Sequence, residues 1–459
     1  MSDAIVVRSP YDGSEVGRVP RHGAVEVDRA VASAGEALRN DPLPPWRRAG
    51  ILDAAARLLA ERVDDFARTI ALESAKPIRT ARIEVKRAVS TFTFAAAEAR
   101  RLTGDMVPVD AAEIGEGRLA FTLRVPVGVV AAISPFNFPL NLVAHKLAPA
   151  IAAGCPVVLK PASQTPLSAV ALARLLIDEC GLPDAYLHVV TGGGDDVGAA
   201  LVEHPDVAFV TFTGSSEVGW GIAAKAGQKR VALELGNNSP VIIEADGDWD
   251  KAARSTATGG FSHAGQSCVS VQRIYVHRSI AGAFTDTLTE LVDELVVGDP
   301  LDEATDVSAL IDESERNRVV AWIAEAVAQG ARVVAGGTIE GGVLRPTVIT
   351  GMTPDMRVSR DEVFGPVVAV RAYESLDEAL RLADDTRFGL QAGIFTASLA
   401  SALRAARELR FGTVLVNEIP TWRADQMPYG GVRGSGNTKE GPAYAVRQMT
   451  EERLVVIQP

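Results

Sequence analysis

The amino-acid sequence predicts an α/β protein with two doubly wound parallel sheets and a smaller β element attached to them. Between residues 127 and 236, short apolar runs such as VGVVAAIS (127–134) and VAFVTFTG (207–214) alternate with helical stretches. A second alternating block runs from SPVIIE (239–244) to TVLVN (413–417). Strands that are apolar along their whole length are typical of parallel sheets covered by helices on both faces. The chain of 459 residues is also long enough for two or three domains of ordinary size.

The region before these blocks predicts two long helices. Residues 47–75 place apolar side chains along one helical face, at Leu52, Ala55, Leu58, Leu59, Val63, Phe66 and Ile70. Lys76-Pro77 should end this helix, because the residue before a proline is driven out of the helical conformation. A second helical pattern then continues to about Leu102.

The smaller β element is predicted from two separate segments. Residues 118–126, RLAFTLRVP, alternate in polarity as a half-exposed strand does, and they follow the acidic, glycine-bearing turn AAEIGEG. This arrangement predicts a hairpin. The C-terminal segment TEERLVVIQP predicts a lone strand, which could either complete that hairpin or pair with another subunit.

Each alternating block contains further predicted elements. The first block adds a helix, TPLSAVALARLLIDEC (165–180), and the strands PVVLKP (156–161), AYLHVVTG (185–192) and RVALELG (230–236). The second block adds the strands QRIYVH (272–277), ARVVAGG (331–337) and GPVVAV (365–370). In such sheets, ligands bind where the carboxyl ends of the strands lead into loops.

Composition excludes several classes of protein. The formal net charge of −12 disfavours binding to nucleic acid or to an anionic membrane surface. The most apolar region, residues 127–159, is interrupted by Pro135, Pro139, His145 and Lys146, so it does not predict a membrane span. The first residues lack the segments of a secretory signal, and three cysteines cannot form a disulfide framework. We therefore expect a cytoplasmic protein without a metal centre that acts on a small molecule.

Cys268 is the candidate nucleophile. It lies in GGFSHAGQSCVSVQRIYV (259–276), in a loop of small polar residues directly before a predicted strand. Cys155 and Cys180 lie in an apolar setting and at the end of an amphipathic helix, and we predict them to be small buried residues. For Cys268, the loop setting alone allows either a nucleophile or another small buried residue.

Two residues could act as the base for this chemistry, and a third could stabilise an oxyanion. His263 lies five residues before the cysteine, which would suit a cysteine hydrolase, but residues five apart do not face each other on a helix. Glu234, in VALELGNNSP, ends a predicted parallel strand, so its carboxylate is a base or a solvated side chain. Asn137, held between Pro135 and Pro139, is either a turn former or a fixed amide donor.

Seven motifs occur in an order that resembles the aldehyde dehydrogenase superfamily. They span residues 134–436 and read SPFNFPLN, VVLKPASQTP, FTGSSEVG, LELGNNSP, GQSCVSVQR, EVFGPV and PYGGVRGSG. The resemblance implies that Cys268 is the nucleophile, Glu234 the general base and Asn137 the oxyanion donor. It also implies oxidation of an aldehyde to a carboxylic acid through a thiohemiacetal and a thioester, with NAD or NADP as the cofactor.

The same resemblance implies contacts with the cofactor. The residues that match are Phe136, Lys160, Ala162, Ser163, Gly214, Ser215, Ser216, Glu362 and Phe364. Backbone N–H groups at the start of the helix after Gly214 suit a pyrophosphate. Where members that prefer NAD would carry a glutamate, this chain has Ser163, with Lys160 nearby. We therefore predict that NADP is accepted and preferred over NAD.

The domain organisation is also implied by the resemblance. A cofactor-binding domain would comprise residues 1–104 and 127–235, with 424–442 returning to it. A catalytic domain would comprise residues 236–423, and an oligomerisation element residues 105–126 and 443–459. A homodimer or a homotetramer is the expected assembly.

The substrate is predicted only as a class. TWRADQMPYGG resembles the branch that acts on lactaldehyde, semialdehydes and aldehydes bearing a phosphonate or sulfonate, and Arg423 either pairs with an anionic tail or forms a structural ion pair. Phosphonoacetaldehyde enzymes would carry a histidine and an arginine where this chain has Phe138 and Ser267, which argues against that substrate and makes both residues candidate substrate contacts. A coenzyme A-acylating enzyme and a nucleotide-independent cysteine esterase are the alternatives, and Glu234 favours water as the acyl acceptor.

Overall fold

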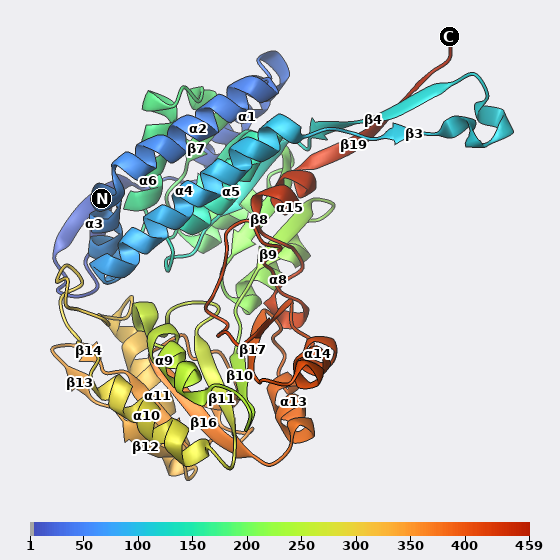
Figure 1. Cartoon of the computed structure of the whole chain (residues 1–459). Coiled ribbons are helices and arrows are strands. Elements are labelled where there is room, and N and C mark those ends of the chain that lie inside the picture. The colour runs from blue at the N-terminus through green and yellow to red at the C-terminus, as the bar shows by residue number, and fades with distance from the viewer. Residues whose placement is uncertain (1–3) are drawn as a thin grey trace.

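The first of two large sheets is fully parallel. The computed structural model describes residues 4–459, and each large sheet in it is covered by helices (Figure 1). The first sheet has five strands in the order β7-β6-β5-β8-β9. They are β5 (Val129–Ile133), β6 (Val157–Lys160), β7 (Leu187–Val189), β8 (Val207–Thr213) and β9 (Arg230–Glu234). These are the strands that the first alternating block predicts.

The second sheet has seven strands in the order β12-β15-β16-β11-β10-β17-β18. They are β10 (Ser239–Ile243), β11 (Val271–His277), β12 (Arg332–Ala335), β15 (Thr347–Thr350), β16 (Val367–Tyr373), β17 (Gln391–Phe395) and β18 (Thr413–Val416). All neighbours are parallel except β12, which pairs antiparallel with β15. The connection between these two strands holds only a small hairpin, β13 (Ile339–Glu340) and β14 (Val343–Leu344), and is too short for a parallel crossover. The expectation of a wholly parallel sheet is therefore wrong at this edge.

Helices cover both faces of the sheets. Around the first sheet lie α1 (Ala24–Asn40), α2 (Pro45–Glu61), α3 (Val63–Ser74), α4 (Ile78–Arg101), α5 (Asn141–Ala153), α6 (Leu167–Arg174), α7 (Ala199–Glu203), α8 (Ser216–Lys225) and α15 (Pro442–Gln448). Around the second lie α9 (Trp249–Gly259), α10 (Ala281–Asp293), α11 (Glu313–Ala328), α12 (Arg357–Arg360), α13 (Leu376–Asp384) and α14 (Leu399–Glu408). No helix within residues 4–459 is both long enough and apolar enough to cross a membrane.

The single helix predicted for residues 47–75 is in fact two helices. Arg62, with φ −120° and ψ 31°, separates α2 from α3, and its guanidinium pairs with Glu179 at 2.5 Å. The break changes the direction of the chain while Phe66 and Ile70 stay buried in the same core. The helix predicted for 165–180 is α6 followed by a wider π-helical turn at Leu175–Glu179. Strands β15 and β17 and the N-terminal hairpin of β1 (Ala4–Arg8) and β2 (Glu15–Pro20) were not predicted.

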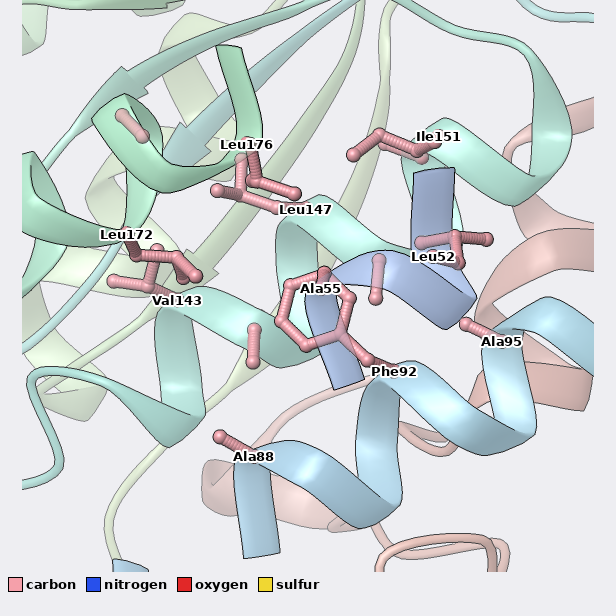
Figure 2. Close-up of a cluster of buried hydrophobic side chains, with 14 of the residues drawn as sticks. Leu52, Ala55, Ala88, Phe92, Ala95, Val143, Leu147, Ile151, Leu172 and Leu176 are labelled. Atoms are coloured by element: carbon pink, nitrogen blue, oxygen red, sulfur yellow. The ribbon is translucent and has the colours of Figure 1, made fainter. Parts of the chain in front are cut away.

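The core between α2, α4 and α5 is apolar and tightly packed. Figure 2 shows Leu52 of α2, Phe92 of α4 and Leu147 of α5 pointing toward one another, and all three are fully buried. Burying a leucine or phenylalanine side chain contributes about 1.5–3 kcal/mol. Cys155 and Cys180 are buried in the same core, which confirms the prediction for both.

The C-terminal strand completes the predicted hairpin. β19 (Thr450–Ile457) pairs antiparallel with β4 (Leu119–Pro126) along its whole length, and β3 (Met106–Val107) pairs with the other edge of β4. These strands project from the body as an arm that carries the C-terminus at its tip (Figure 1).

Candidate active site

A cleft of about 1180 Å³ lies between the carboxyl ends of the first sheet and the loops and helices around the second sheet. Its walls come from the loop after β5, the loop after β6, the end of β8, and the segment that links β9 to β10. Loops around the second sheet contribute Cys268, Glu362 and Phe364. The segment that follows β18 contributes Tyr429 and Glu440. The three candidate catalytic residues, Asn137, Glu234 and Cys268, therefore meet in one cleft although their motifs are widely separated in the chain.

Cys268 lies in the loop before β11 and is half-buried. Its Sγ is 2.9 Å from the hydroxyl oxygen of Tyr429. Burial raises the pKa of the Cys268 thiol to about 12, the Tyr429 hydrogen bond and the charge of Arg423 act against that rise, and the carboxylates of Glu362 and Glu234 add to it. Any group that favours the thiolate therefore matters to the reactivity of this sulfur.

Glu234 is the last residue of β9 and is almost fully buried. Neither carboxylate oxygen has a hydrogen-bond partner among residues 4–459. Burial raises the pKa of Glu234 well above its usual value, and the nearby Glu440 raises it further, while Arg423 and Lys146 oppose this. A carboxylate with so high a pKa is a stronger base than one in water, which suits it to take a proton in the cleft.

Asn137 is also buried, in the loop after β5. Its Nδ2 donates one hydrogen bond to the backbone oxygen of Gln266, with a length of 2.9 Å. A side-chain amide carries two N–H donors, so one remains for a substrate oxygen. Because Gln266 belongs to the loop of Cys268, this bond ties the amide to the loop of the nucleophile.

A buried ion pair supports the Asn137 loop. Lys76 and Glu84 pair with each other, and both side chains have no exposed surface. Lys76 Nζ also donates to the backbone oxygen of Asn137 at 2.7 Å, while Glu84 Oε1 accepts from the N–H groups of Leu140 and Asn141 at 2.9 and 3.0 Å. The pair thus holds the Asn137 loop at its middle and at its junction with α5, and sequence reasoning did not identify it.

The predicted cofactor residues line the cleft, with one exception. Phe136, Lys160, Ala162, Ser163, Gly214, Ser215, Glu362 and Phe364 form its walls. Ser216 does not, because its hydroxyl donates to the backbone oxygen of Gly434 at 2.7 Å and points into the protein. Ser215 caps α8, so the first N–H groups of that helix lie beside the cleft.

These residues fit a nicotinamide dinucleotide. The cleft is long enough to join the start of α8 to the loop of Cys268, and the helix start can hold a pyrophosphate. Glu362 accepts a hydrogen bond from the N–H of Asn237 at 3.0 Å, and burial raises its pKa to about 7. Phe136 and Phe364 meet edge to face with ring centres 5.8 Å apart, giving an apolar wall for a flat ring.

The three candidate substrate contacts lie outside the lining of this cleft. Phe138 packs beneath the ammonium group of Lys76, which is 3.8 Å from its ring centre. Ser267 lines a separate small crevice that it shares with Glu362. Arg423 has a side chain only 6% exposed and pairs with Glu440 at 2.8 Å.

Arg423 belongs to a charged cluster beside the thiol. Its guanidinium lies over the ring of Tyr429 at 3.8 Å and 3.0 Å from a ring nitrogen of His145. The cluster continues to Asp425, which also pairs with Arg87 of α4 at 2.9 Å. Arg423, in the same loop as Tyr429, and Arg87 of α4 therefore both lie near Asp425.

Sequence reasoning missed three polar residues of the site. Tyr429 and Glu440 line the cleft, and Lys146 donates to the hydroxyls of Thr211 and Thr213 at 3.0 and 2.8 Å. Burial lowers the pKa of Lys146 to about 8. Tyr429 lies within PYGGVRGSG, one of the seven motifs that resemble the family, but nothing in its local sequence indicates a contact with sulfur.

His263 is not the partner of the thiol. It is buried, its ring faces Phe138, and neither ring nitrogen has a hydrogen-bond partner among residues 4–459. Burial lowers its pKa well below the usual histidine value, so the ring is neutral. Its place beside the sulfur is taken by Tyr429.

Comparison with known proteins agrees with this geometry. The family model described as "Aldehyde dehydrogenase family" matches residues 1–455. A 3-sulfolactaldehyde dehydrogenase of Priestia aryabhattai is 50% identical over 432 residues, covering 94% of this chain and 90% of the relative. A lactaldehyde dehydrogenase of Methanococcus aeolicus is 37% identical over 459 residues, covering 99% and 97%. The crystal structure of a glyceraldehyde-3-phosphate dehydrogenase from Methanocaldococcus jannaschii, complexed with NADP, has a TM-score of 0.95 at 36% identity and covers 99% of each chain. The chain belongs to the aldehyde dehydrogenase family.

Proposed function

We propose that this nicotinamide-dependent aldehyde dehydrogenase oxidises a small anionic 2-hydroxyaldehyde to the free acid, with Cys268 as nucleophile, Glu234 as base and Asn137 as oxyanion donor. The observation that carries the proposal is the convergence of these three side chains, from three separate segments, near one end of a cleft that fits a dinucleotide. The arginines of the charged cluster, Arg423 over the Tyr429 ring and Arg87 beside Asp425, support the choice of an anionic substrate.

The residues act in sequence on the aldehyde carbon. The Cys268 thiolate forms a bond to that carbon, and the electron pair of the C=O bond moves to oxygen, where the free N–H of Asn137 Nδ2 stabilises it. When bound, the nicotinamide cofactor supplies the hydride acceptor. Glu234 then takes a proton from a water molecule that attacks the resulting thioester, and Cys268 departs as thiolate with release of the acid.

The substrate class is supported by the charges near the thiol. Arg423 contacts Tyr429, which in turn contacts Sγ, and Arg87 keeps 25% of its side chain exposed. The relatives named above act on aldehydes that carry a sulfonate, a hydroxyl or a phosphate. An arginine suits such tails because its guanidinium can donate two parallel hydrogen bonds.

A substrate panel tests this assignment. We expect kcat/KM for 3-sulfolactaldehyde to exceed that for lactaldehyde, and both to exceed that for propanal. Replacement of the partly exposed arginine, Arg87→Leu, should raise KM for the sulfonate by about tenfold to a hundredfold and change KM for propanal little. Arg101→Leu is the control, because Arg101 lies on the same helix as Arg87 and pairs with Glu98 at the surface. Equal losses on both substrates would make Arg87 structural.

We further propose that NADP is preferred over NAD. Ser163 presents no carboxylate to a 2′-phosphate, and its hydroxyl is held by a hydrogen bond to the Gly192 oxygen at 2.9 Å. Lys160 and Lys225 also line this part of the cleft and supply positive charge. Solved relatives at 36% identity include an NADP complex and an NAD-dependent enzyme, so the comparison of kcat/KM for the two nucleotides decides the preference.

The assembly and the domain division are proposals of the same kind. We propose a homodimer or homotetramer formed through the arm of residues 105–126 and 443–459, with a cofactor-binding domain of 1–104, 127–235 and 424–442 and a catalytic domain of 236–423. The exposed apolar side chains Leu119, Leu123, Leu454 and Val456 along the arm support this role. Light scattering on the intact protein and on a variant with these four residues changed to serine tests it.

A cytoplasmic location, supported by the three free cysteines, is tested by cell fractionation.

A further inference from the structure

The Cys268 sulfur has a polar contact with Tyr429. The hydroxyl oxygen lies 2.9 Å from Sγ, and Tyr429 is almost fully buried. Its ring packs against Val269 and Leu390. The backbone of Tyr429 also pairs with Glu440 in a short antiparallel bridge, which fixes the main chain that carries the ring.

The hydroxyl group can only be the donor once the thiol has ionised, because a thiolate has no hydrogen to give. Burial raises the pKa of Tyr429 well above its usual value, and the neighbouring Cys268 raises it further. The hydroxyl therefore keeps its hydrogen at neutral and mildly alkaline pH. A tyrosine that cannot ionise in this range is a permanent donor.

Arg423 strengthens this donor. Its guanidinium lies 3.8 Å from the centre of the Tyr429 ring, and Glu440 holds it there through the 2.8 Å ion pair. A cation over the ring withdraws electron density, which makes the O–H a better donor and adds positive potential near the sulfur. Two carboxylates, Glu234 and Glu362, face the same sulfur and oppose its ionisation. Formation of the thiolate therefore depends on the hydrogen bond from Tyr429 and the positive charge of Arg423.

We propose that Tyr429 is a catalytic residue that donates its hydroxyl hydrogen to the Cys268 sulfur and so favours the reactive thiolate, with Arg423 as its positioning residue. The inference rests on the proposed role of Cys268 as nucleophile. Tyr429 itself is not deprotonated: its hydrogen stays on the tyrosine oxygen, and the thiol proton passes to solvent water.

The test is the rate at which Cys268 is alkylated by iodoacetamide in wild type and in Tyr429→Phe. This substitution keeps the ring and its contact with Arg423 and removes only the hydroxyl. Between pH 7 and 9 the rate follows the thiolate fraction, so loss of a hydrogen bond to a charged group should lower it about tenfold, up to a hundredfold. Mass spectrometry assigns the label to Cys268, and melting temperatures verify that the variant is folded.

Tyr444→Phe is the matched control, because Tyr444 is a partly exposed tyrosine of α15. Its alkylation rate should equal that of wild type. The value of kcat/KM for the aldehyde should fall in Tyr429→Phe by the same factor as alkylation, because both reactions need the thiolate. An alkylation rate in Tyr429→Phe that equals or exceeds the wild-type rate would overturn the proposal.

A further variant, Cys268→Ala, separates this proposal from the proposed function. If Cys268→Ala retains aldehyde oxidation, the nucleophile assignment itself fails. If Cys268→Ala is inactive while Tyr429→Phe is alkylated at the wild-type rate, only the role of Tyr429 fails.

Discussion

The substitution Glu84→Gln tests the buried ion pair that supports the Asn137 loop. Glu84 and Lys76 have no exposed side-chain surface, so the substitution leaves an ammonium group inside the protein without its carboxylate. Removal of one partner from a buried pair costs about 3–5 kcal/mol. The introduced glutamine side chain keeps an oxygen that can accept from the N–H groups of Leu140 and Asn141, so we expect the lower end, about 3 kcal/mol.

The loss should depend on pH. Burial already lowers the pKa of Lys76, and without Glu84 that pKa must fall further. The unfolded chain then binds more protons than the folded one at pH values between the folded pKa and the usual lysine value of about 10.4, so stability rises with pH in that window. The destabilisation is therefore full below the folded pKa of Lys76 and shrinks as the pH rises.

Catalysis should suffer as well, because Lys76 and Glu84 fix the loop of the oxyanion donor. Loss of one such donor typically lowers kcat by about 10²–10³, and a displaced donor should cost less, about tenfold to a hundredfold. Binding of the nucleotide should change little, since neither residue lines the cleft.

Urea unfolding followed by tryptophan fluorescence, with kcat and KM measured on the same samples, provides the assay. Glu61→Gln is the control, because Glu61 forms an exposed pair with Arg57 that should contribute less than about 1 kcal/mol. The double variant Lys76→Met/Glu84→Gln should recover much of the lost stability, since it removes both charges. If Glu84→Gln unfolds at the same urea concentration as Glu61→Gln, the reasoning is wrong.

Three further predictions concern the chemistry of the site. Cys268→Ala should abolish aldehyde oxidation while nucleotide binding, followed by fluorescence titration, survives, because the sulfur bonds to the substrate and does not hold the cofactor; turnover in this variant would contradict the mechanism. Glu234→Gln should give a burst of reduced nucleotide followed by a slow steady rate in rapid-mixing absorbance, since an amide cannot take a proton from water. In wild type, kcat should rise as the pH increases through the raised pKa of Glu234, because only the ionised carboxylate can take a proton. If Glu234→Gln shows the same dependence of kcat on pH, another group is responsible for it. Ser163→Glu should shift preference from NADP toward NAD, because a carboxylate there repels a 2′-phosphate by about 1–4 kcal/mol; an unchanged ratio of kcat/KM values would remove Ser163 from the specificity site.

Much of the fold was predictable because its signals are local. The apolar runs at 127–134 and 207–214 became β5 and β8, and the long pattern ending near Leu102 became α4. Strands missed by pattern, such as β17 (QAGIF), begin with a polar residue and contain glycine, so their short sequence does not stand out. The break at Arg62 was missed because the apolar spacing continues on both sides of it.

By itself, the sequence determined the alternation of strands and helices, the absence of a disulfide framework, and the ordered motifs that carry Asn137, Glu234 and Cys268. Each of these depends on neighbouring residues, or on motif order along one chain. Only the tertiary structure decided that Tyr429 contacts the sulfur, that Arg423 pairs with Glu440, and that Lys76 and Glu84 hold the Asn137 loop. The physical reason is that Tyr429 contacts Cys268, and Lys76 contacts the Asn137 loop, across long stretches of the chain. All of these contacts also depend on burial, which strengthens charge interactions and raises the cost of an unpaired group. No local pattern of side chains encodes which distant partners folding brings together.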